Sequence, residues 1–343
     1  MTTLRTAATA VPFGDLTYGA ANVGNLFRAL TDDDAAAVLE AAWEAGIRSF
    51  DTAPHYGLGL SERRLGAFLR TKPRDEFVIS TKVGRLLRPN PEADGGLDLD
   101  NDFHVPTDLR REWDLSADGI RRSLEESLER LGLDRVDVLY LHDPERHSLR
   151  EGLDSAIPAL AALRDERTVS AVGVGAMTTE ALTASAETGA IDLLMVAGRF
   201  TLAEQPAALD VFPACDRNGV GVVVASVFNS GLLAQDVPAR DGRYEYGSVP
   251  DDVFDRVSAI AAVCAEFDVP LPHVALQFVQ RHPLVRTVVV GASRPEQIRQ
   301  NAERMGAPVP DGVWNRLEED GLVSALSPRC VPSSERCVPS SDV

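Results

Sequence analysis

The chain has 343 residues, of which 44% are hydrophobic and 25% are charged, and its formal net charge is −18. The acidic surplus argues against a nucleic-acid or anionic-membrane surface, because both require clustered cations. No apolar run approaches the roughly 20 residues that span a bilayer, and residues 1–11 lack the apolar segment of a secretory signal peptide. We therefore expect a cytoplasmic protein that has neither a nucleic acid nor a membrane as a partner.

The predicted secondary structure alternates short apolar strands with helices along the chain. The strands begin near residues 16, 47, 77, 135, 169, 191, 220 and 286. Helical patterns lie between them, at about 31–45, 60–70, 116–131, 156–165 and 179–188, then up to 218, at 251–267 and 272–281, and from 295. Eight such β/α units predict an α/β protein with a single (β/α)₈ TIM barrel over residues 1–323. A doubly wound open sheet is the alternative, but no Gly-x-Gly-x-x-Gly follows the first strand.

Two polar segments interrupt this regular pattern. Residues 85–113 are rich in Pro, Gly and Asp and are too long for a plain connection, so we expect a lid or substrate loop there. A solvated insertion without function is the alternative. Residues 324–343 repeat Arg-Cys-Val-Pro-Ser-Ser and lack a helical period, which predicts a disordered tail.

The cysteines and histidines show no metal-binding pattern. No set of His, Cys and carboxylate residues has the spacing of a zinc site, so we expect no metal. The cysteines also form no dense disulfide framework, which agrees with a reducing compartment; they are Cys215, Cys264, Cys330 and Cys337.

Three chemically matched side chains fall within one strand–loop–helix–strand unit. Asp51 and Lys82 end two strands that are expected to be neighbours, and Tyr56 lies in the loop between them. A phenol titrates near ~10, but an adjacent ammonium favours the phenolate, and a carboxylate keeps that ammonium charged. The unit therefore predicts proton transfer by a phenol. The alternatives are an aspartate that caps a turn, a solvated lysine and an amphipathic loop tyrosine.

One histidine shares this edge of the predicted barrel. His142 ends the strand that begins near residue 135, so its side chain is expected on the same rim as Asp51 and Lys82. A packed or capping histidine is the alternative.

From residue 16 to about 305 the chain resembles the aldo-keto reductase superfamily. The resemblance rests on residues 46–53, 56–57, 61–62, 80–82, 124–132 and 141–144. It implies an NAD(P)-dependent oxidoreductase with Asp51, Tyr56, Lys82 and His142 as the catalytic tetrad. Tyr56 would exchange a proton with the substrate oxygen, Lys82 paired with Asp51 would tune it, and His142 would orient that oxygen.

Three regions are expected to bind NADP or NAD, and the resemblance implies the second and third of them. The first region is the end of the first strand, where a glycine allows close approach of a ligand. The second region would bind the pyrophosphate through its backbone amides. The third would bind the adenosine phosphate at a helix N-terminus. The expected residues are Gly19 and Ala20, then Phe228, Asn229, Ser230, Gly231 and Leu232, then Gly291, Ser293, Arg294, Gln297 and Asn301.

The chain departs from the family pattern around the cofactor. Gly175-Ala176 stands where many members have Ser-Asn for the carboxamide, and Ala197 replaces a glutamine. Gly291 and Gln297 replace the Lys and Arg that NADP-preferring members often carry, although Arg294 could bind a 2′-phosphate bidentately. Either cofactor is therefore expected.

Residues 53–64, 82–87 and 227–231 look most like the aldose 1-dehydrogenase group. This likeness implies oxidation of a cyclic aldose hemiacetal to a lactone, with Tyr56 as the base. The alternatives are a general aldehyde, ketone or pyridoxal oxidoreductase, a cofactor-binding regulatory subunit like the potassium-channel β-subunit relatives, and a lyase that uses Lys82 as a Schiff base. The expected partner is a small sugar or aldehyde substrate, and the expected state is a monomer or weak homo-oligomer.

Overall fold

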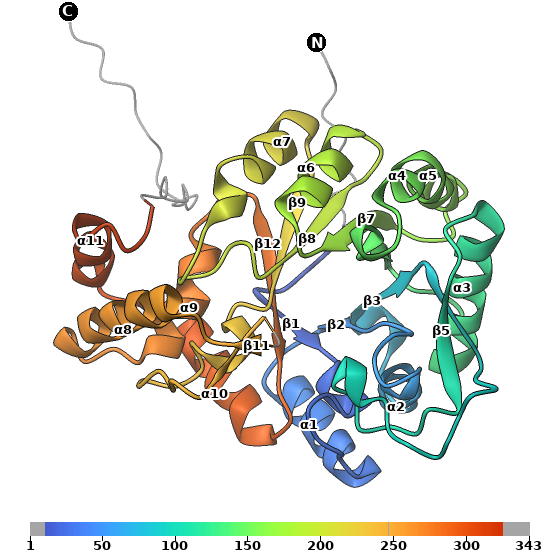
Figure 1. The fold of residues 1–343 in the computed structure, drawn as a ribbon, viewed down its shortest axis with the longest axis horizontal. Helices are drawn as coiled ribbons and strands as arrows, with labels where there is room; N and C mark the ends of the chain where they lie inside the picture. The colour runs from blue at the N-terminus through green and yellow to red at the C-terminus, as the bar shows by residue number, and fades with distance from the viewer. Residues whose placement is uncertain (1–10, 246, 325–343) are drawn as a thin grey trace, which may run out of the picture.

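Eight parallel strands close into a barrel at the centre of the computed structural model, which describes residues 11–245 and 247–324 (Figure 1). Each strand pairs with its neighbours around the ring in the order β1-β12-β9-β8-β7-β6-β3-β2. This closed sheet confirms the predicted (β/α)₈ barrel. The bounds are β1 (Leu16–Gly19), β2 (Ser49–Asp51), β3 (Val78–Val83), β6 (Val138–His142), β7 (Ala171–Ala176), β8 (Leu193–Ala197), β9 (Gly221–Ala225) and β12 (Val285–Gly291).

The strand residues explain why the barrel forms. β3, β6 and β7 are buried along their whole length, as is usual for parallel strands that are covered by helices outside and by side chains inside. Val, Ile and Leu predominate in these strands because branched side chains pack well on a pleated surface. The carboxyl ends of all eight strands meet on one face, which brings distant parts of the chain together there.

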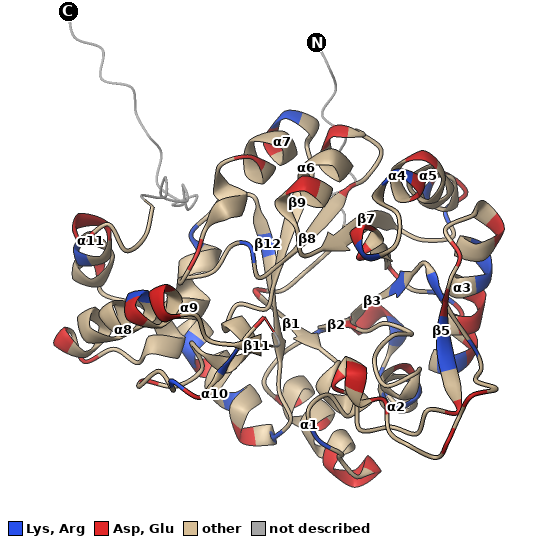
Figure 2. Cartoon of the chain, in the orientation of Figure 1, with Lys and Arg blue, Asp and Glu red and all other residues tan. Residues whose placement is uncertain are grey.

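Helices surround the barrel in Figure 1, and acidic and basic residues are interspersed over their outer faces (Figure 2). The first helix begins with a capping box: Thr31 Oγ1 accepts from the Asp34 amide, and the Asp34 carboxylate accepts from the Thr31 amide in return. The helices are α1 (Asp32–Glu44), α2 (Leu60–Leu69), α3 (Ala117–Leu131), α4 (Leu149–Glu151), α5 (Ile157–Asp165), α6 (Thr179–Glu187), α7 (Val211–Asn218), α8 (Asp251–Glu266), α9 (Leu271–Gln280), α10 (Pro295–Gly306) and α11 (Asp311–Glu319).

The segment predicted as a lid or substrate loop contains a hairpin. β4 (Arg85–Pro89) and β5 (Leu109–Trp113) pair antiparallel, with Arg85 opposite Trp113. Three consecutive charged residues, Arg110, Arg111 and Glu112, form the middle of β5, which hid its strand pattern in the sequence. The chain between the two strands packs Phe103 and Val105 against Leu58 and Leu87 in a small apolar cluster, so this segment is anchored to the barrel.

Some sequence predictions lie at the edge of the described residues. The predicted tail begins at 324, and residues 325–343, with Cys330 and Cys337, lie outside the described part of the chain, so the domain boundary at 323 stays a prediction. Cys215 and Cys264 are buried and free. Within residues 11–245 and 247–324 no single helix is long and apolar enough to cross a membrane, although α8 and α9, bent by 101°, meet that criterion together by length and composition.

Candidate active site

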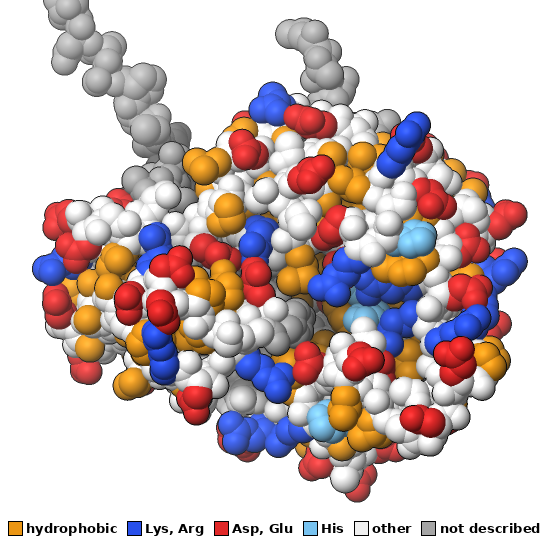
Figure 3. All heavy atoms as spheres, viewed as in Figure 1, with side chains coloured by type: hydrophobic (Ala, Val, Ile, Leu, Met, Phe, Trp, Pro, Cys, Tyr) orange, Lys and Arg blue, Asp and Glu red, His pale blue; other side chains and the backbone are white. Residues whose placement is uncertain are grey.

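A cavity of about 670 Å³ opens at the carboxyl ends of the barrel strands. Asp51, Tyr56, Lys82 and His142 all line it. Figure 3 shows Lys, Arg and His side chains gathered beside the hollow in this face of the molecule. The four residues predicted to share one rim are therefore brought to one place by the fold.

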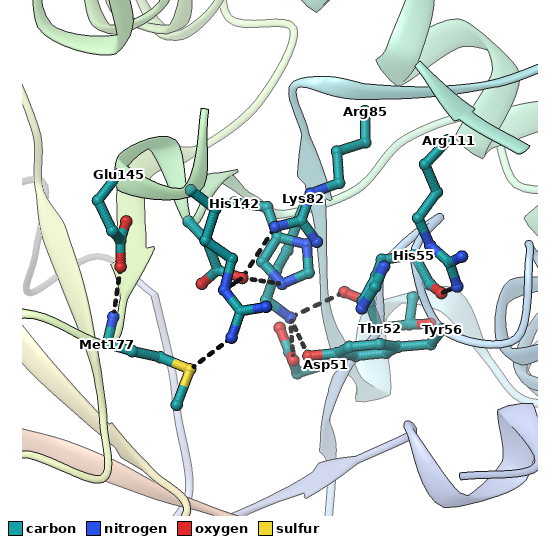
Figure 4. Close-up of polar contacts among 12 residues, drawn as sticks. Asp51, Thr52, His55, Tyr56, Lys82, Arg85, Arg111, His142, Glu145 and Met177 are labelled. Carbon is teal, nitrogen blue, oxygen red and sulfur yellow. Dashed lines mark hydrogen bonds and ion pairs between the residues drawn. The ribbon is translucent and has the colours of Figure 1, made fainter. Parts of the chain in front are cut away.

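Lys82 is the centre of the polar contacts in this cavity (Figure 4). Its Nζ lies 2.5 Å from Asp51 Oδ2 and donates to the Tyr56 hydroxyl at 3.2 Å and to the Thr52 carbonyl at 3.0 Å. Burial opposes the ammonium, but the charges of Asp51 and Tyr56 outweigh it, so the pKa of Lys82 lies above its usual value. Lys82 is only 2% exposed, which excludes the solvated alternative and leaves it as a buried cation held against the phenol.

The loop that carries Tyr56 is held by residues from several elements. The Thr52 and Ser61 hydroxyls hydrogen-bond to each other at 2.8 Å, and Ser61 donates to the Ala20 carbonyl at 2.7 Å. Gly57 has φ +61, and a Cβ there would lie 2.1 Å from the Gly24 carbonyl oxygen, so only glycine fits. These contacts fix the position of the phenol beside Lys82.

The buried Glu62 links this loop to two other parts of the barrel. Its carboxylate accepts from Thr81 at 2.8 Å and from Arg130 at 2.6 Å, and it is fully buried. Glu62, Thr81 and Arg130 all belong to the segments on which the sequence resemblance rests. The structure thus gives these residues a supporting position behind the cavity.

His142 presents a neutral imidazole to Tyr56. The two rings are 5.8 Å apart and nearly perpendicular, at 88°. Burial, together with the positive charges of Arg85 and Lys82, holds the pKa of His142 well below its usual value. A neutral ring has one donor and one acceptor nitrogen, so it can orient a substrate oxygen, and the carboxylate nearest to it is that of Asp143, whose Oδ2 lies 3.6 Å from His142 Nε2.

Two arginines near the cavity were not singled out from the sequence. Arg85 pairs with Asp143 at 2.9 Å and lies over the Trp113 ring at 4.4 Å. Arg111 pairs with Asp98 at 2.5 Å and donates to the His55 carbonyl at 2.8 Å. Both come from the strands of the β4–β5 hairpin, and the density of arginine in residues 85–113 was the signal that could have identified them.

The predicted cofactor residues divide into two groups. Ala20 and Leu232 are buried in the apolar core, Arg294 is exposed just before α10, and Asn301 is buried within that helix. The other predicted residues line the cavity: Gly19, Phe228, Asn229, Ser230, Gly231, Gly291, Ser293 and Gln297. Gly175, Ala176 and Ala197 also line it, so small side chains occupy the positions where the family pattern has polar ones.

The lining residues have features that suit a dinucleotide. Asn229 Oδ1 is buried without a hydrogen-bond partner among the described residues. A Cβ at Gly291 would lie 2.5 Å from Asn22 Oδ1, so a larger residue would fill the cradle there. The Ser293 amide donates to Gln297 Oε1 at 3.0 Å. The Ser293 carbonyl accepts from Arg28 at 2.8 Å, and Arg28 was not predicted from the sequence.

No group of three or more His, Cys, Asp or Glu side chains in the described part of the chain is placed to hold a metal ion.

Comparison with known proteins identifies the family to which this chain belongs. Residues 15–320 match the sequence profile of the Aldo/keto reductase family. The chain belongs to the aldo/keto reductases. It is therefore an oxidoreductase of a family that uses a nicotinamide cofactor.

Three individual proteins are similar to this chain over most of its length. This aldo/keto reductase is 64% identical to D-threo-aldose 1-dehydrogenase from Pseudomonas sp. over 318 residues, which cover 92% of this chain and 97% of that protein. It is 36% identical to pyridoxal 4-dehydrogenase from Microbacterium luteolum over 339 residues, covering 93% and 96%. The structure of glycerol dehydrogenase from Gluconobacter oxydans has the same fold, with a TM-score of 0.71 at 21% identity and 97% of each chain covered.

The buried histidines predict how stability depends on pH. His142 titrates well below its usual pKa in the folded enzyme, whereas it titrates near ~6.5 when unfolded. The stabilising contribution of the neutral His142 ring to the free energy of unfolding is therefore fully present above pH ~6.5. It is lost as pH falls from ~6.5 towards the folded-state pKa, by up to about 1.4 kcal/mol per pH unit. Urea unfolding of His142→Gln between these limits should show a shallower decline than wild type.

Equal slopes for wild type and His142→Gln would contradict the buried neutral state of His142.

Proposed function

We propose that this aldo/keto reductase is an NAD(P)-dependent aldose 1-dehydrogenase that oxidises a cyclic hemiacetal to a lactone. The proposal rests mainly on the position of the Tyr56 hydroxyl, which lies 3.2 Å from the buried Lys82 ammonium. Lys82 is itself paired with Asp51, and all three residues line the cavity. The 64% identity to D-threo-aldose 1-dehydrogenase supports the choice of an aldose as substrate.

In this proposal Tyr56 is the general base. A nicotinamide cofactor bound in this cavity would supply the hydride acceptor for the anomeric carbon. The Tyr56 oxygen takes the proton from the anomeric hydroxyl, so the C–H and O–H bonds are replaced by the carbonyl of the lactone. The Lys82 ammonium favours negative charge on the phenol oxygen before the proton arrives, and the Asp51 carboxylate keeps Lys82 charged and in place.

His142 positions the reacting oxygen. Its ring faces Tyr56 at 88°, and its neutral state lets one nitrogen donate to the anomeric oxygen while Tyr56 accepts the proton. A hydrogen bond aimed at the position where charge changes is a recurrent source of transition-state stabilisation. In the reverse reaction, the same residues would protonate the oxygen of a carbonyl group that receives a hydride at its carbon.

We further propose that the cofactor lies along the arc of residues from β9 to α10. The segments 228–231 and 291–297 would hold its phosphates, and the buried acceptor of Asn229 would bind a donor of the dinucleotide. Arg294, exposed beside the cavity-lining Ser293, is the cation through which a 2′-phosphate would be recognised. Ala176 and Ala197 offer no side-chain hydrogen bond, so backbone groups and shape would place the nicotinamide.

Pyridoxal is the second candidate substrate. The 36% identity to pyridoxal 4-dehydrogenase over 93% of the chain supports it. The cavity of about 670 Å³ leaves the choice open, because its size suits either molecule.

The test is an oxidation assay of the purified full chain. The near-ultraviolet absorbance of reduced nicotinamide is followed with NAD⁺ or NADP⁺ and a panel that contains L-fucose, D-arabinose and pyridoxal. We expect absorbance to rise with at least one aldose, and a lower KM for NADP⁺ than for NAD⁺ would support the role of Arg294. A rise with pyridoxal alone would favour the second candidate. Absence of oxidation, with reduction of simple aldehydes instead, would contradict the aldose proposal.

A further inference from the structure

His55 is a second histidine in the cavity that the proposed mechanism does not use. It lies directly before Tyr56 and lines the same cavity. Its ring is 5.6 Å from the His142 ring at 79°, and 5.5 Å from Phe103 at 88°. Figure 4 shows His55 beside Tyr56 and Lys82, on the side of Arg111. The imidazole is thus a neighbour of both groups that would hold the reacting oxygen.

The position of His55 is determined from outside its own loop. Arg111, itself held by Asp98, donates to the His55 carbonyl at 2.8 Å. Phe103, which is 2% exposed, packs edge-to-face on the ring. Both contacts come from residues 85–113, the segment predicted to contact substrate. The hairpin therefore fixes the backbone and the ring of His55 together.

The ring has polar capacity that the protein leaves unused. Within the described residues, Nδ1 of His55 is buried without a hydrogen-bond partner. A buried polar group without a partner is costly and is rare in native proteins, so it calls for a role. Burial, followed by the charges of Arg111 and Arg85, holds the pKa of His55 well below its usual value. A neutral imidazole carries one donor and one acceptor, which is also what a hydroxyl group offers.

We propose that His55 is a specificity-determining residue that hydrogen-bonds the hydroxyl on the carbon next to the anomeric carbon of the aldose. This inference rests on the proposed function. Adjacent hydroxyls of a sugar ring need two adjacent hydrogen-bonding groups, and His142 and His55 form such a pair along one wall of the cavity. His142 binds the reacting oxygen, and His55 binds its neighbour. An aldehyde without that hydroxyl leaves the imidazole unpaired.

The experiment compares an aldose with the analogue that lacks this hydroxyl. kcat/KM is measured for L-fucose and 2-deoxy-L-fucose, and for D-arabinose and its 2-deoxy form, with wild type, His55→Leu and His55→Asn. We expect wild type to prefer the complete sugar by roughly 10-fold to 100-fold, because a site built for a hydroxyl rejects the analogue without it. His55→Leu should lose most of this preference, and His55→Asn, which keeps a donor and an acceptor, should retain part of it.

Two controls separate recognition from folding. His147→Leu changes an exposed histidine outside the cavity and should keep the wild-type preference. A thermal shift on addition of NADP⁺ or NAD⁺ shows that each variant folds and binds cofactor.

The outcomes are distinct for the two proposals. Equal losses of kcat/KM for the sugar and its 2-deoxy form in His55→Leu would overturn the inference, because His55 would then only support the site. A wild-type enzyme that oxidises aldoses but does not distinguish the two forms would overturn it as well. Failure of the wild type to oxidise any aldose would instead contradict the proposed function, and the inference would fall with it.

Discussion

Replacing Tyr56 by phenylalanine is expected to lower kcat by a factor of roughly 10² or more, the usual effect of removing a positioned acid–base group. The variant loses the oxygen that lies 3.2 Å from Lys82 but keeps the ring that faces His142 and packs on Phe103. Cofactor binding should therefore remain near the wild-type level. Steady-state kinetics with the best aldose, together with fluorescence titration of the cofactor, measure the two effects separately.

The matched control for this variant is Tyr244→Phe. The Tyr244 hydroxyl donates to Glu204 at 2.6 Å, and the residue does not line the cavity. Loss of the Tyr244 hydroxyl should have little effect on kcat, although Tyr244→Phe, like Tyr56→Phe, removes one phenol oxygen. Full activity in Tyr56→Phe would rule out the phenol as the base and would make Schiff-base chemistry at Lys82 the next hypothesis to test.

Replacing Lys82 by methionine is expected to reduce both activity and stability. The variant leaves the Asp51 carboxylate, 2% exposed, without the ammonium 2.5 Å away. Breaking a buried ion pair by removing one partner typically costs about 3–5 kcal/mol of folding free energy, because an uncompensated charge stays buried. Activity should fall together with stability because the phenol loses its neighbouring positive charge. Urea unfolding and steady-state kinetics measure the two losses.

A double variant distinguishes these two effects. Asp51→Asn combined with Lys82→Met removes both charges, and the asparagine oxygen can still accept from Ser80, which lies 2.7 Å from Asp51 in the native enzyme. Most of the lost stability should return, since replacing both partners of a buried pair is often neutral. Activity should remain low. Recovery of activity along with stability would show that Lys82 acts only on the fold.

The shared position of Asp51, Tyr56, Lys82 and His142 was predictable because parallel strands place their carboxyl ends on one rim. Asp51 and Lys82 end adjacent strands, paired in register through Asp51 and Ser80, and Tyr56 lies in the loop that joins the first of them to α2. His142 ends β6, which pairs directly with β3. Residue spacing and the barrel prediction were therefore enough to bring these four side chains together before any packing was known.

For the proposed cofactor residues, the sequence predicted only which regions reach the cavity. The segments 228–232 and 291–301 do reach the cavity, but Leu232 points into the core and Asn301 is buried in α10. Arg28, which contacts Ser293, comes from the opposite end of the chain. Which side chain of a loop faces a ligand depends on backbone angles that residue types alone do not specify.

By itself, the sequence determined the eight β/α units, the closed barrel they predict, and the rim shared by Asp51, Tyr56, Lys82 and His142, since these follow from periodicity and local connectivity. Only the tertiary structure decided how residues 85–113 return across that rim. The hairpin placed Arg111 on the His55 carbonyl and Phe103 on its ring, and thereby set a second imidazole beside His142. The physical reason is that such contacts join segments far apart in the chain, and their geometry comes from the packing of the whole fold.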